Sequence, residues 1–336
     1  MKKIAILTPT FSQFSGIDRL VERQAEDYSK EGYEVTIVCF KAEIKTKYAK
    51  VIELGMPKNQ TLERIYRLFY FLMDIEIDKV ADQLKGFDKI ICHFYPMSVI
   101  ASKAKEKYGI HYEYHNAGVA DANLFDSFIE GTYMRLFRLL TNHYMKKADE
   151  IICISDFLRD VVKKEINMES NLEYVKIDTK RFHKGIDGSR IKEKYGIKPK
   201  DKLCLYVGRL SPHKGIDLLL KVINKLNGKY KLLIVGKPTF DKYFEMLKEM
   251  ASDRVTFVGF VPDSELPEYY AACDTYVTAS KWEGFAMPIV EAAECGKPSV
   301  AFNIAAHPEV LKNGKLVKFG DIEAFAKAVV ELNEKM

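Results

Sequence analysis

Residues 275–291 read TYVTASKWEGFAMPIVE, and this stretch passes from a strand pattern to a helix pattern within a few residues. The apolar and β-branched run 275–279 is typical of a buried strand. Pro288 suits the first position of a helix, where a backbone N–H is not needed. The glycine at 284 lets a ligand approach the backbone closely. The stretch therefore predicts a strand, a loop open to a ligand and a helix, in that order.

The same alternation of short apolar runs and amphipathic stretches continues along the chain. Continuous apolar strands, each followed by a helix, indicate a parallel sheet covered on both faces. We expect strands at 3–7, 34–40, 89–93, 111–115 and 150–154, and again at 202–208, 231–236, 255–259, 275–279 and 298–302. Helical patterns at 18–30, 62–84 and 217–226 lie between them. Because the pattern occurs twice, the sequence predicts two doubly wound, Rossmann-like α/β domains.

The length of 336 residues suits two domains of ordinary size. Residues 165–171 and 176–200 are polar and poor in apolar periodicity, so we expect a boundary near Lys184. The domains are then 1–184 and 185–336. Ligands of open α/β sheets bind beyond the carboxyl ends of the strands. Two such domains facing across a cleft predict an active site in that cleft.

The composition is that of a soluble globular protein, with 47% hydrophobic and 29% charged residues. The net charge of +5 suits an anionic ligand or an acidic membrane surface, but it is too small and too evenly spread to indicate nucleic acid. Met1-Lys-Lys precedes an apolar run of only four residues, which favours a first strand over a secretory signal. Six cysteines form no CxxC pair and four lie in strand-like runs, so we expect buried thiols in a cytoplasmic protein.

A pair of cations follows the strand expected at 202–208. The loop reads GRLSPHKG from Gly208 to 215 and carries Arg209 and Lys214 at the carboxyl end of that strand. Arginine binds phosphate oxygens with two parallel hydrogen bonds, and lysine acts as a compact point charge. Together they suit a diphosphate, and the alternative is a pair of solvated surface charges.

Two glutamates flank the start of the helix expected at Pro288. Glu283 lies in the loop and is placed to address a sugar, whereas Glu291 lies about one turn into the helix. Helical side chains lean toward the helix N-terminus, so Glu291 should point toward the same ligand and accept hydrogen bonds from ribose hydroxyls. The N-terminus itself offers free N–H groups to an anion. The alternative for Glu291 is a simple partner of the helix dipole.

The second half resembles the nucleotide-sugar-binding domain of the family 4, group 1 glycosyltransferases, which have the GT-B fold. The resemblance rests on the ordered pieces VGRLSPHKG (207–215), VGF (258–260), Ser280-x-x-Glu-Gly-Phe, EAAECGKPSVA (291–301) and HPEV (307–310). It implies that the donor-binding residues are Gly208, Arg209, Lys214, Gly236, Val258, Gly259, Phe260, Glu283, Gly284, Phe285, Ala286, Met287, Pro288 and Glu291. Gly236 and residues 258–260 would line the base pocket.

The first half resembles the same family more faintly. Gly16 stands where relatives have a glycine-rich loop near the donor phosphate, although Ser15 replaces the usual first glycine. His115 ends the strand expected at 111–115, where relatives have a histidine near the reacting sugar. Ala286 also stands where a glycine is common, and so do Ala305 and 306. Relatives continue beyond the position of Met336 into a further helix, so we expect a minimal or truncated C-terminus.

The resemblance implies transfer of a hexose from a nucleoside diphosphate sugar with retention of configuration, without a metal or other cofactor. His115, Arg209, Lys214 and Glu283 would be the catalytic residues, and no protein nucleophile is expected. The acceptor would be a glycan, a lipid-linked molecule or another hydroxyl compound of cell-envelope polysaccharide or glycolipid synthesis. Two alternatives remain: a nucleotide-sugar 2-epimerase of related fold, whose acid/base set we do not find, and a non-catalytic partner that binds nucleotide sugar.

Two aromatic and basic segments are candidates for membrane contact. Residues 62–73 (LERIYRLFYFLM) and 133–147 (YMRLFRLLTNHYMKK) are helix-prone. Their basic residues, which would face lipid phosphates, are Arg64, Arg67, Arg135, Arg138, Lys146 and Lys147. The alternative is that both are ordinary helices packed on the sheet. The sequence thus predicts a cytoplasmic protein, with peripheral contact to the inner face of a membrane as an open possibility.

Overall fold

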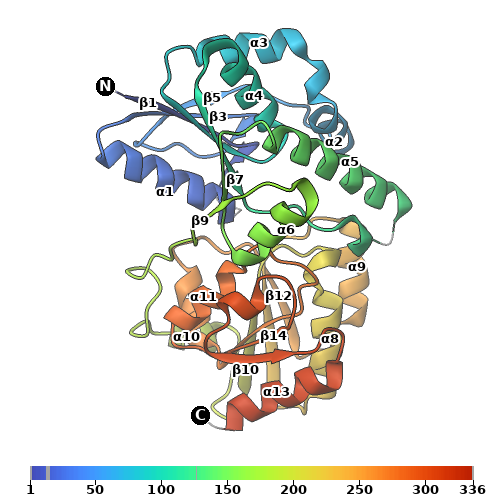
Figure 1. The fold of residues 1–336 in the computed structure, drawn as a ribbon. Coiled ribbons are helices and arrows are strands. Elements are labelled where there is room, and N and C mark those ends of the chain that lie inside the picture. The colour runs from blue at the N-terminus through green and yellow to red at the C-terminus, as the bar shows by residue number, and fades with distance from the viewer. Residues whose placement is uncertain (1, 13–15, 126, 335–336) are drawn as a thin grey trace. The chain divides into compact units, whose positions relative to one another are not determined.

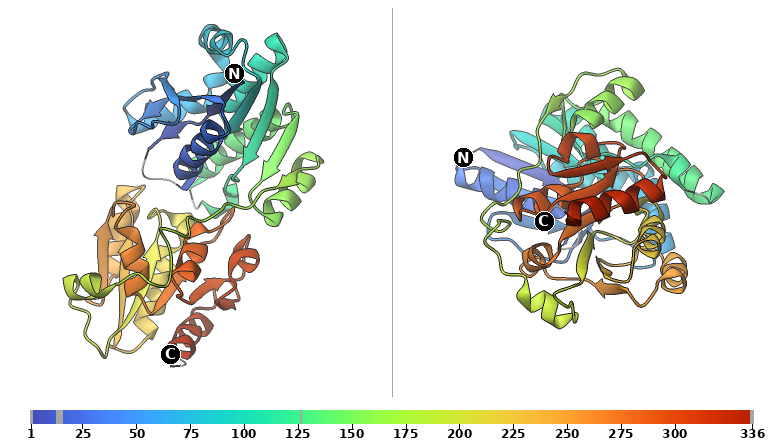
Figure 2. Two further views of the ribbon diagram at one scale, coloured as in Figure 1. Left: turned by 90° about the vertical axis from the view of Figure 1, so that its left-hand side faces the viewer. Right: turned by 90° about the horizontal axis from the view of Figure 1, so that it is seen from below.

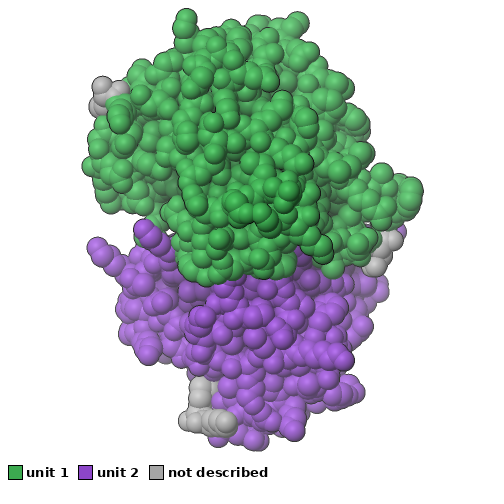
Figure 3. Space-filling view, viewed as in Figure 1, with its two compact units in different colours: residues 1–175 green, residues 176–336 purple. Residues whose placement is uncertain are grey.

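The computed structural model describes residues 2–12, 16–125 and 127–334, which form two α/β units (Figures 1 and 2). Unit 1 comprises Met1–Val175 and unit 2 comprises Lys176–Met336, shown in green and purple in Figure 3. The chain divides after Val175, ahead of the boundary expected near Lys184.

Within its described residues, unit 1 has a sheet of seven parallel strands in the order β5-β3-β1-β6-β7-β8-β9. The strands are β1 (Lys3–Leu7), β3 (Glu34–Cys39), β5 (Lys50–Glu53), β6 (Lys89–His93), β7 (His111–Asn116), β8 (Glu150–Cys153) and β9 (Asn171–Leu172). Two short strands, β2 (Thr10–Phe11) and β4 (Lys41–Ala42), pair beside it. The helical elements are α1 (Gly16–Lys30), α2 (Gln60–Leu68), η1 (Tyr70–Leu72), α3 (Asp74–Gln83), α4 (Met97–Tyr108), η2 (Ala122–Leu124), α5 (Phe128–Met145) and α6 (Asp156–Ile166).

Unit 2 has a second parallel sheet, with the order β12-β11-β10-β13-β14-β15. This is the 3-2-1-4-5-6 order of dinucleotide-binding domains. The strands are β10 (Lys202–Val207), β11 (Tyr230–Val235), β12 (Val255–Gly259), β13 (Thr275–Thr278), β14 (Ser299–Phe302) and β15 (Gly314–Val317). The helical elements are α7 (Ser189–Lys194), η3 (Pro212–Lys214), α8 (Ile216–Lys225), α9 (Asp241–Met250), α10 (Leu266–Ala272), α11 (Met287–Glu294), α12 (His307–Val310) and α13 (Ile322–Glu334).

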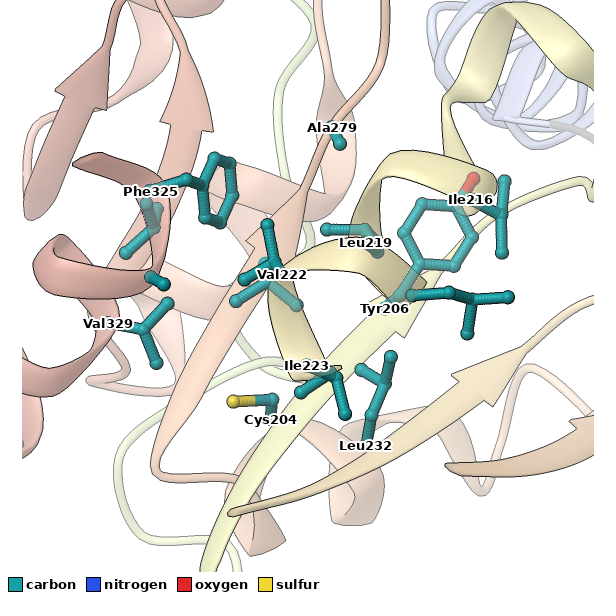
Figure 4. Close-up of a cluster of buried hydrophobic side chains, with 14 of the residues drawn as sticks. Cys204, Tyr206, Ile216, Leu219, Val222, Ile223, Leu232, Ala279, Phe325 and Val329 are labelled. Atoms are coloured by element: carbon teal, nitrogen blue, oxygen red, sulfur yellow. The ribbon is translucent and has the colours of Figure 1, made fainter. Parts of the chain in front are cut away.

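The core of unit 2 shows why these strands are continuous apolar runs. Cys204 and Tyr206 of β10 face a cluster that α8 and α13 complete, including Leu219 and Val329 (Figure 4). Leu203 and its neighbour at 205 alternate with them and are equally buried. Both faces of the strand are therefore covered, as parallel sheets require.

The expectation of two doubly wound domains is confirmed, and most expected strands form within one or two residues of their expected ends. The sequence pattern missed β2, β4, β5, β9 and β15, which are short, partly polar or at an edge of their sheet. The expected helix at 62–84 is wrong as a single element. It divides into α2, η1 and α3, because the backbone leaves helical geometry at Met73 while Tyr70 turns into the core.

The strand order reverses once in each sheet, between β1 and β6 in unit 1 and between β10 and β13 in unit 2. At such a switch point the neighbouring loops leave in opposite directions and open a crevice at the carboxyl ends of the strands. The loop after β10 and the loop after β13 therefore meet where a ligand of unit 2 is expected.

Candidate donor site and the buried histidines

The loop after β10 depends on close backbone packing at its two glycine ends. Gly215 has φ +63°, and a Cβ there would lie 2.1 Å from the carbonyl oxygen of Ala279. A Cβ on Gly236, after β11, would lie 1.9 Å from the carbonyl oxygen of Gly208. Only glycine fits such approaches. The loop is thereby held against the end of β13, and the Lys281 amide donates to the His213 carbonyl at 2.8 Å.

Lys214 and Glu283 meet at this switch point. The Lys214 Nζ lies 2.7 Å from the Glu283 Oε1, and both side chains are 17% exposed. Ser280 Oγ donates to the same carboxylate oxygen at 2.8 Å. Burial by itself would raise the pKa of Glu283, but the nearby charges and hydrogen bonds, Lys214 first among them, outweigh it and lower the pKa. The structure thus joins the two residues in a single ionised cluster.

Arg209 and His213 flank this cluster in different ways. Arg209 is exposed, and its carbonyl accepts a hydrogen bond from the Tyr206 hydroxyl. Burial, together with the charges of Lys214 and Arg209, lowers the pKa of His213 to about 3. His213 is therefore neutral at physiological pH, and the positive charge of the loop belongs to Arg209 and Lys214.

Glu291 lies about one turn into α11 and is buried rather than presented on the surface. It is 1% exposed, and its Oε2 accepts a hydrogen bond of 2.7 Å from the hydroxyl of the buried Tyr270 on α10. Met287 occupies the first helical position and Pro288 the second, after Ala286 at φ +64°. Gly284, Phe285 and Ala286 are buried as well. Sequence reasoning missed Tyr270, because nothing in its local pattern marks a contact with α11.

The residues expected to line a base pocket lie together at the ends of β11 and β12. The Gly236 amide donates to the Gly259 carbonyl at 2.8 Å. Val258 is partly buried in β12, and the Phe260 ring is 37% exposed with the Lys237 ammonium 5.0 Å from its centroid. The Phe260 ring therefore offers an exposed aromatic surface beside the carboxyl ends of β11 and β12.

In unit 1, the expected site residues are Gly16 and His115. Gly16 is the first residue of α1, while Phe14 and Ser15 lie outside the described residues. His115 lies near the carboxyl end of β7 and is 5% exposed. Its Nδ1 lies 3.0 Å from the Gln24 Nε2. His93 is fully buried beside it. Sequence reasoning missed Gln24.

In the described part of the chain, one group of side chains has the composition of a metal site. His111, Glu113 and Glu150 bring ligand atoms within 4.8 Å of one another. Glu113 there already forms an ion pair with Lys89, whose Nζ lies 2.5 Å from its Oε1. Among the described helices, none is both long and apolar enough to cross a bilayer.

Two family models match the chain in the order of its units. A model described as Glycosyltransferase Family 4 matches residues 14–175, and one described as Glycosyl transferases group 1 matches residues 187–335. The matched segments lie within unit 1 and unit 2 respectively.

Curated relatives match part of the chain at 30–33% identity. The O-antigen chain mannosyltransferase B of Escherichia coli is 33% identical over 136 residues, which are 38% of this chain and 36% of the relative. A GDP-mannose-dependent phosphatidylinositol monomannoside mannosyltransferase of Mycolicibacterium smegmatis is 30% identical over 206 residues, 55% of this chain and 53% of the relative. The matched part of the chain thus spans about a third and about half of the lengths of these relatives.

Solved structures match nearly the whole chain. Sucrose-phosphate synthase from Thermosynechococcus elongatus has a TM-score of 0.85 at 18% identity, over 99% of this chain and 90% of that one. HepE of Anabaena in complex with UDP-glucose has a TM-score of 0.79 at 21% identity, over 100% of this chain and 90% of that one. At such identities the likeness shows a shared fold.

Proposed function

Because the chain belongs to the family 4, group 1 glycosyltransferases and has their GT-B fold, we propose that it transfers a hexose from a nucleoside diphosphate sugar to a hydroxyl acceptor. The observation that carries the proposal is the cluster of Lys214, Glu283 and Ser280 at the switch point of unit 2. It combines a cation for phosphate with a carboxylate for sugar hydroxyls. The mannosyltransferase relatives and the UDP-glucose complex of HepE support a nucleotide-sugar donor.

The leaving diphosphate gains negative charge as the glycosidic bond breaks. We assign stabilisation of that charge to Arg209 and Lys214, with the N-terminus of α11 as a third contributor. An ammonium group has three donors, so Lys214 can bind a phosphate oxygen while it keeps its bond to Glu283. The ionised Glu283 accepts hydrogen bonds from sugar hydroxyls, and Glu291, oriented by Tyr270, accepts them from the ribose.

The finer features of the reaction are also part of the proposal. Transfer proceeds with retention, without a metal, and the donor phosphate takes the acceptor proton, so no protein nucleophile acts. In unit 1, we assign His115 to a position beside the reacting sugar and Gly16 to the loop that approaches the phosphate. The acceptor is a glycan or a lipid-linked molecule, the class on which the mannosyltransferase relatives act by name.

Isothermal titration of the full chain with UDP-glucose, GDP-mannose and ADP-glucose tests the donor assignment. We expect one of them to bind, which also identifies the base, and EDTA should leave binding and nucleotide release unchanged. Binding of none of the three would contradict a nucleotide-sugar donor. Loss of activity on chelation that added Mg²⁺ restores would contradict metal independence.

We also propose that unit 1 contacts an anionic membrane surface through α2, η1, the start of α3, and α5. Ten large apolar side chains there are exposed: Leu62, Ile65, Phe69, Leu72, Met73, Ile75, Phe128, Ile129, Leu136 and Leu139. Arg135 and Lys146 of the same face are exposed too, whereas Arg64 and Arg138 are engaged with Glu130 and Glu165. The apolar side chains therefore contribute more to this surface than the sequence pattern suggested.

Co-sedimentation with vesicles of phosphatidylglycerol and phosphatidylcholine tests the surface. The paired change Phe128→Ser and Ile129→Ser removes side chains that are 82% and 78% exposed. Full burial of such a side chain contributes about 1.5–3 kcal/mol, and we assume that each buries half of this in the membrane surface. Loss of both side chains should therefore weaken binding at least about tenfold. Leu316→Ser with Phe319→Ser, on exposed residues of unit 2, is the matched control and should bind normally. Equal binding by both pairs would contradict the assignment.

A further inference from the structure

Two buried histidines lie side by side at the carboxyl ends of β6 and β7. His93 and His115 are partners in the strand register, their ring centroids are 5.3 Å apart, and they are 0% and 5% exposed. His93 ends the strand at which the order of the unit 1 sheet reverses. The next residue, Phe94, has φ +63°, a left-handed conformation that tends to occur at functional positions. The pair thus occupies the part of the sheet where ligands bind.

A glutamine of α1 connects the two rings. The Gln24 Nε2 lies 3.0 Å from the His115 Nδ1, and its Oε1 lies 2.8 Å from the His93 Nε2. The amide nitrogen only donates and the amide oxygen only accepts. Gln24 therefore offers a donor to one imidazole and an acceptor to the other.

A carboxylate faces the other side of His115. Glu113 lies two residues earlier on the same face of β7, and its Oε2 is 3.5 Å from the His115 Nε2. Its Oε1 forms the ion pair with Lys89 and lies 3.3 Å from the His111 Nε2. Burial favours the neutral acid, but the contacts with His115 and Lys89 outweigh it and lower the pKa of Glu113 to about 2. At neutral pH this group can only accept hydrogen bonds.

We propose that Glu113 and Gln24 together determine which ring nitrogen of His115 and of His93 carries the proton, which makes Gln24 a positioning residue for His115. The Glu113 carboxylate faces the His115 Nε2 at 3.5 Å and repels a lone pair there, so the His115 proton sits on Nε2. The His115 Nδ1 then accepts from the Gln24 amide nitrogen, which leaves the amide oxygen toward His93. His93 must donate through its Nε2, and its Nδ1 is left unprotonated.

The opposite orientation of the Gln24 amide fails on the same contacts. It would set the amide oxygen against the His115 Nδ1 and so require the proton there. In a ring with a single proton, the lone pair on the His115 Nε2 would then face the Glu113 carboxylate, which is repulsive. Burial and the neighbouring His115 also lower the pKa of His93 well below its usual range, so His93 stays neutral. One carboxylate thereby orders two imidazoles through a single amide.

The role of this relay in transfer rests on the proposed function, because it assumes that His115 lies beside the sugar. Gln24 belongs to the helix that begins at Gly16, and its two bonds tie that helix to β6 and β7. The relay therefore fixes the His115 ring and the position of the helix start together.

Long-range ¹H–¹⁵N correlation spectra of the full chain, labelled on its seven histidines, test the proton positions directly. The signals are assigned with His93→Asn and His115→Asn. In the wild type, we expect the proton of each ring on Nε2 and none on Nδ1. Gln24→Met keeps the length of the side chain but removes its hydrogen bonds to both rings, and should give mixed tautomers. Gln24→Glu puts a carboxylate at each His115 nitrogen, so the His115 Nδ1 should then carry a proton as well as the Nε2.

Gln83→Met, on the exposed end of α3, is the matched control and should leave both histidine signals unchanged. A wild-type His115 with its proton on Nδ1 would overturn the relay. So would wild-type signals in both Gln24 variants, once thermal unfolding shows them folded.

Release of nucleoside diphosphate from UDP-glucose, GDP-mannose and ADP-glucose tests the role in transfer. Misorientation of a group at a reacting centre costs orders of magnitude in rate, so Gln24→Met should lower kcat at least about tenfold while KM for the donor changes less than about threefold. Unchanged kcat with altered tautomers would overturn the positioning role. A wild-type chain that releases no nucleotide would count against the proposed function, while the spectra still decide the relay.

Discussion

Lys214→Met separates the two roles that we assign to the Lys214 ammonium. In the absence of donor, the change leaves the Glu283 carboxylate without its cation, with Ser280 still donating at 2.8 Å. In the presence of donor, it also removes a phosphate contact. The first effect is measured as stability and the second as binding and transfer.

The expected stability loss follows from how far the pair is buried. Exposed ion pairs contribute about 0–1 kcal/mol, and removing one partner of a buried pair costs about 3–5 kcal/mol. Both side chains are 17% exposed, so we expect a loss of about 2–3 kcal/mol at pH 7. The double variant Lys214→Met/Glu283→Gln should recover about 1–2 kcal/mol of it, because the uncompensated charge is gone.

The pH dependence has a defined sign. In the wild type the folded pKa of Glu283 is lowered, so its contribution is fully present above the usual glutamate value of about 4.3 and is lost as pH falls through the folded value. Without Lys214, burial raises that pKa, and ionisation then destabilises the variant as pH rises. The stability gap between wild type and Lys214→Met should therefore widen from pH 4 to pH 7.

Urea unfolding at both pH values measures the gap. The matched control is Lys225→Met, which removes a lysine from an exposed pair with Glu323, and it should cost less than about 1 kcal/mol at either pH. In the transfer assay, Lys214→Met should be slower at least about tenfold, or about 1.4 kcal/mol. Equal losses in the two lysine variants, or normal turnover without Lys214, would refute the reasoning.

Tyr270→Phe removes the hydrogen bond to the buried Glu291 and should lower the free energy of unfolding by about 1.5–3 kcal/mol. Titration should show donor affinity about tenfold weaker. Unchanged donor affinity would contradict the assignment of Glu291 to the ribose site. Ala286→Gly removes the strain of a left-handed alanine, about 1–2 kcal/mol, but it also removes a buried methyl group and raises the conformational entropy of the unfolded chain. These effects oppose one another, so the free energy of unfolding should change by less than about 1 kcal/mol. The control is Ala292→Gly, at a buried helical position of α11, which should lower the free energy of unfolding by about 1–2 kcal/mol. Equal losses for Ala286→Gly and Ala292→Gly in urea unfolding would contradict the strain at Ala286.

Local sequence was enough to locate most strands, and edge strands show where it was not. The run KLCLYV of β10 is buried on both faces, so its apolar character is continuous and visible. The edge strand β5 reads KVIE and β15 reads GKLV, and both are largely exposed or half-buried. These two strands have little apolar surface to bury, so their sequences resemble loops.

For the site, sequence determined the chemical groups at the strand ends: two cations after β10, two glutamates around the start of α11, and two histidines at the ends of β6 and β7. Tertiary structure alone decided their partners. Lys214 meets Glu283 across 69 residues, and Gln24 meets His115 across 91. Such contacts depend on strand order and on which face of a helix meets the sheet. Periodicity of 2 or 3.6 residues carries information about the face that is buried, but none about the element that covers it.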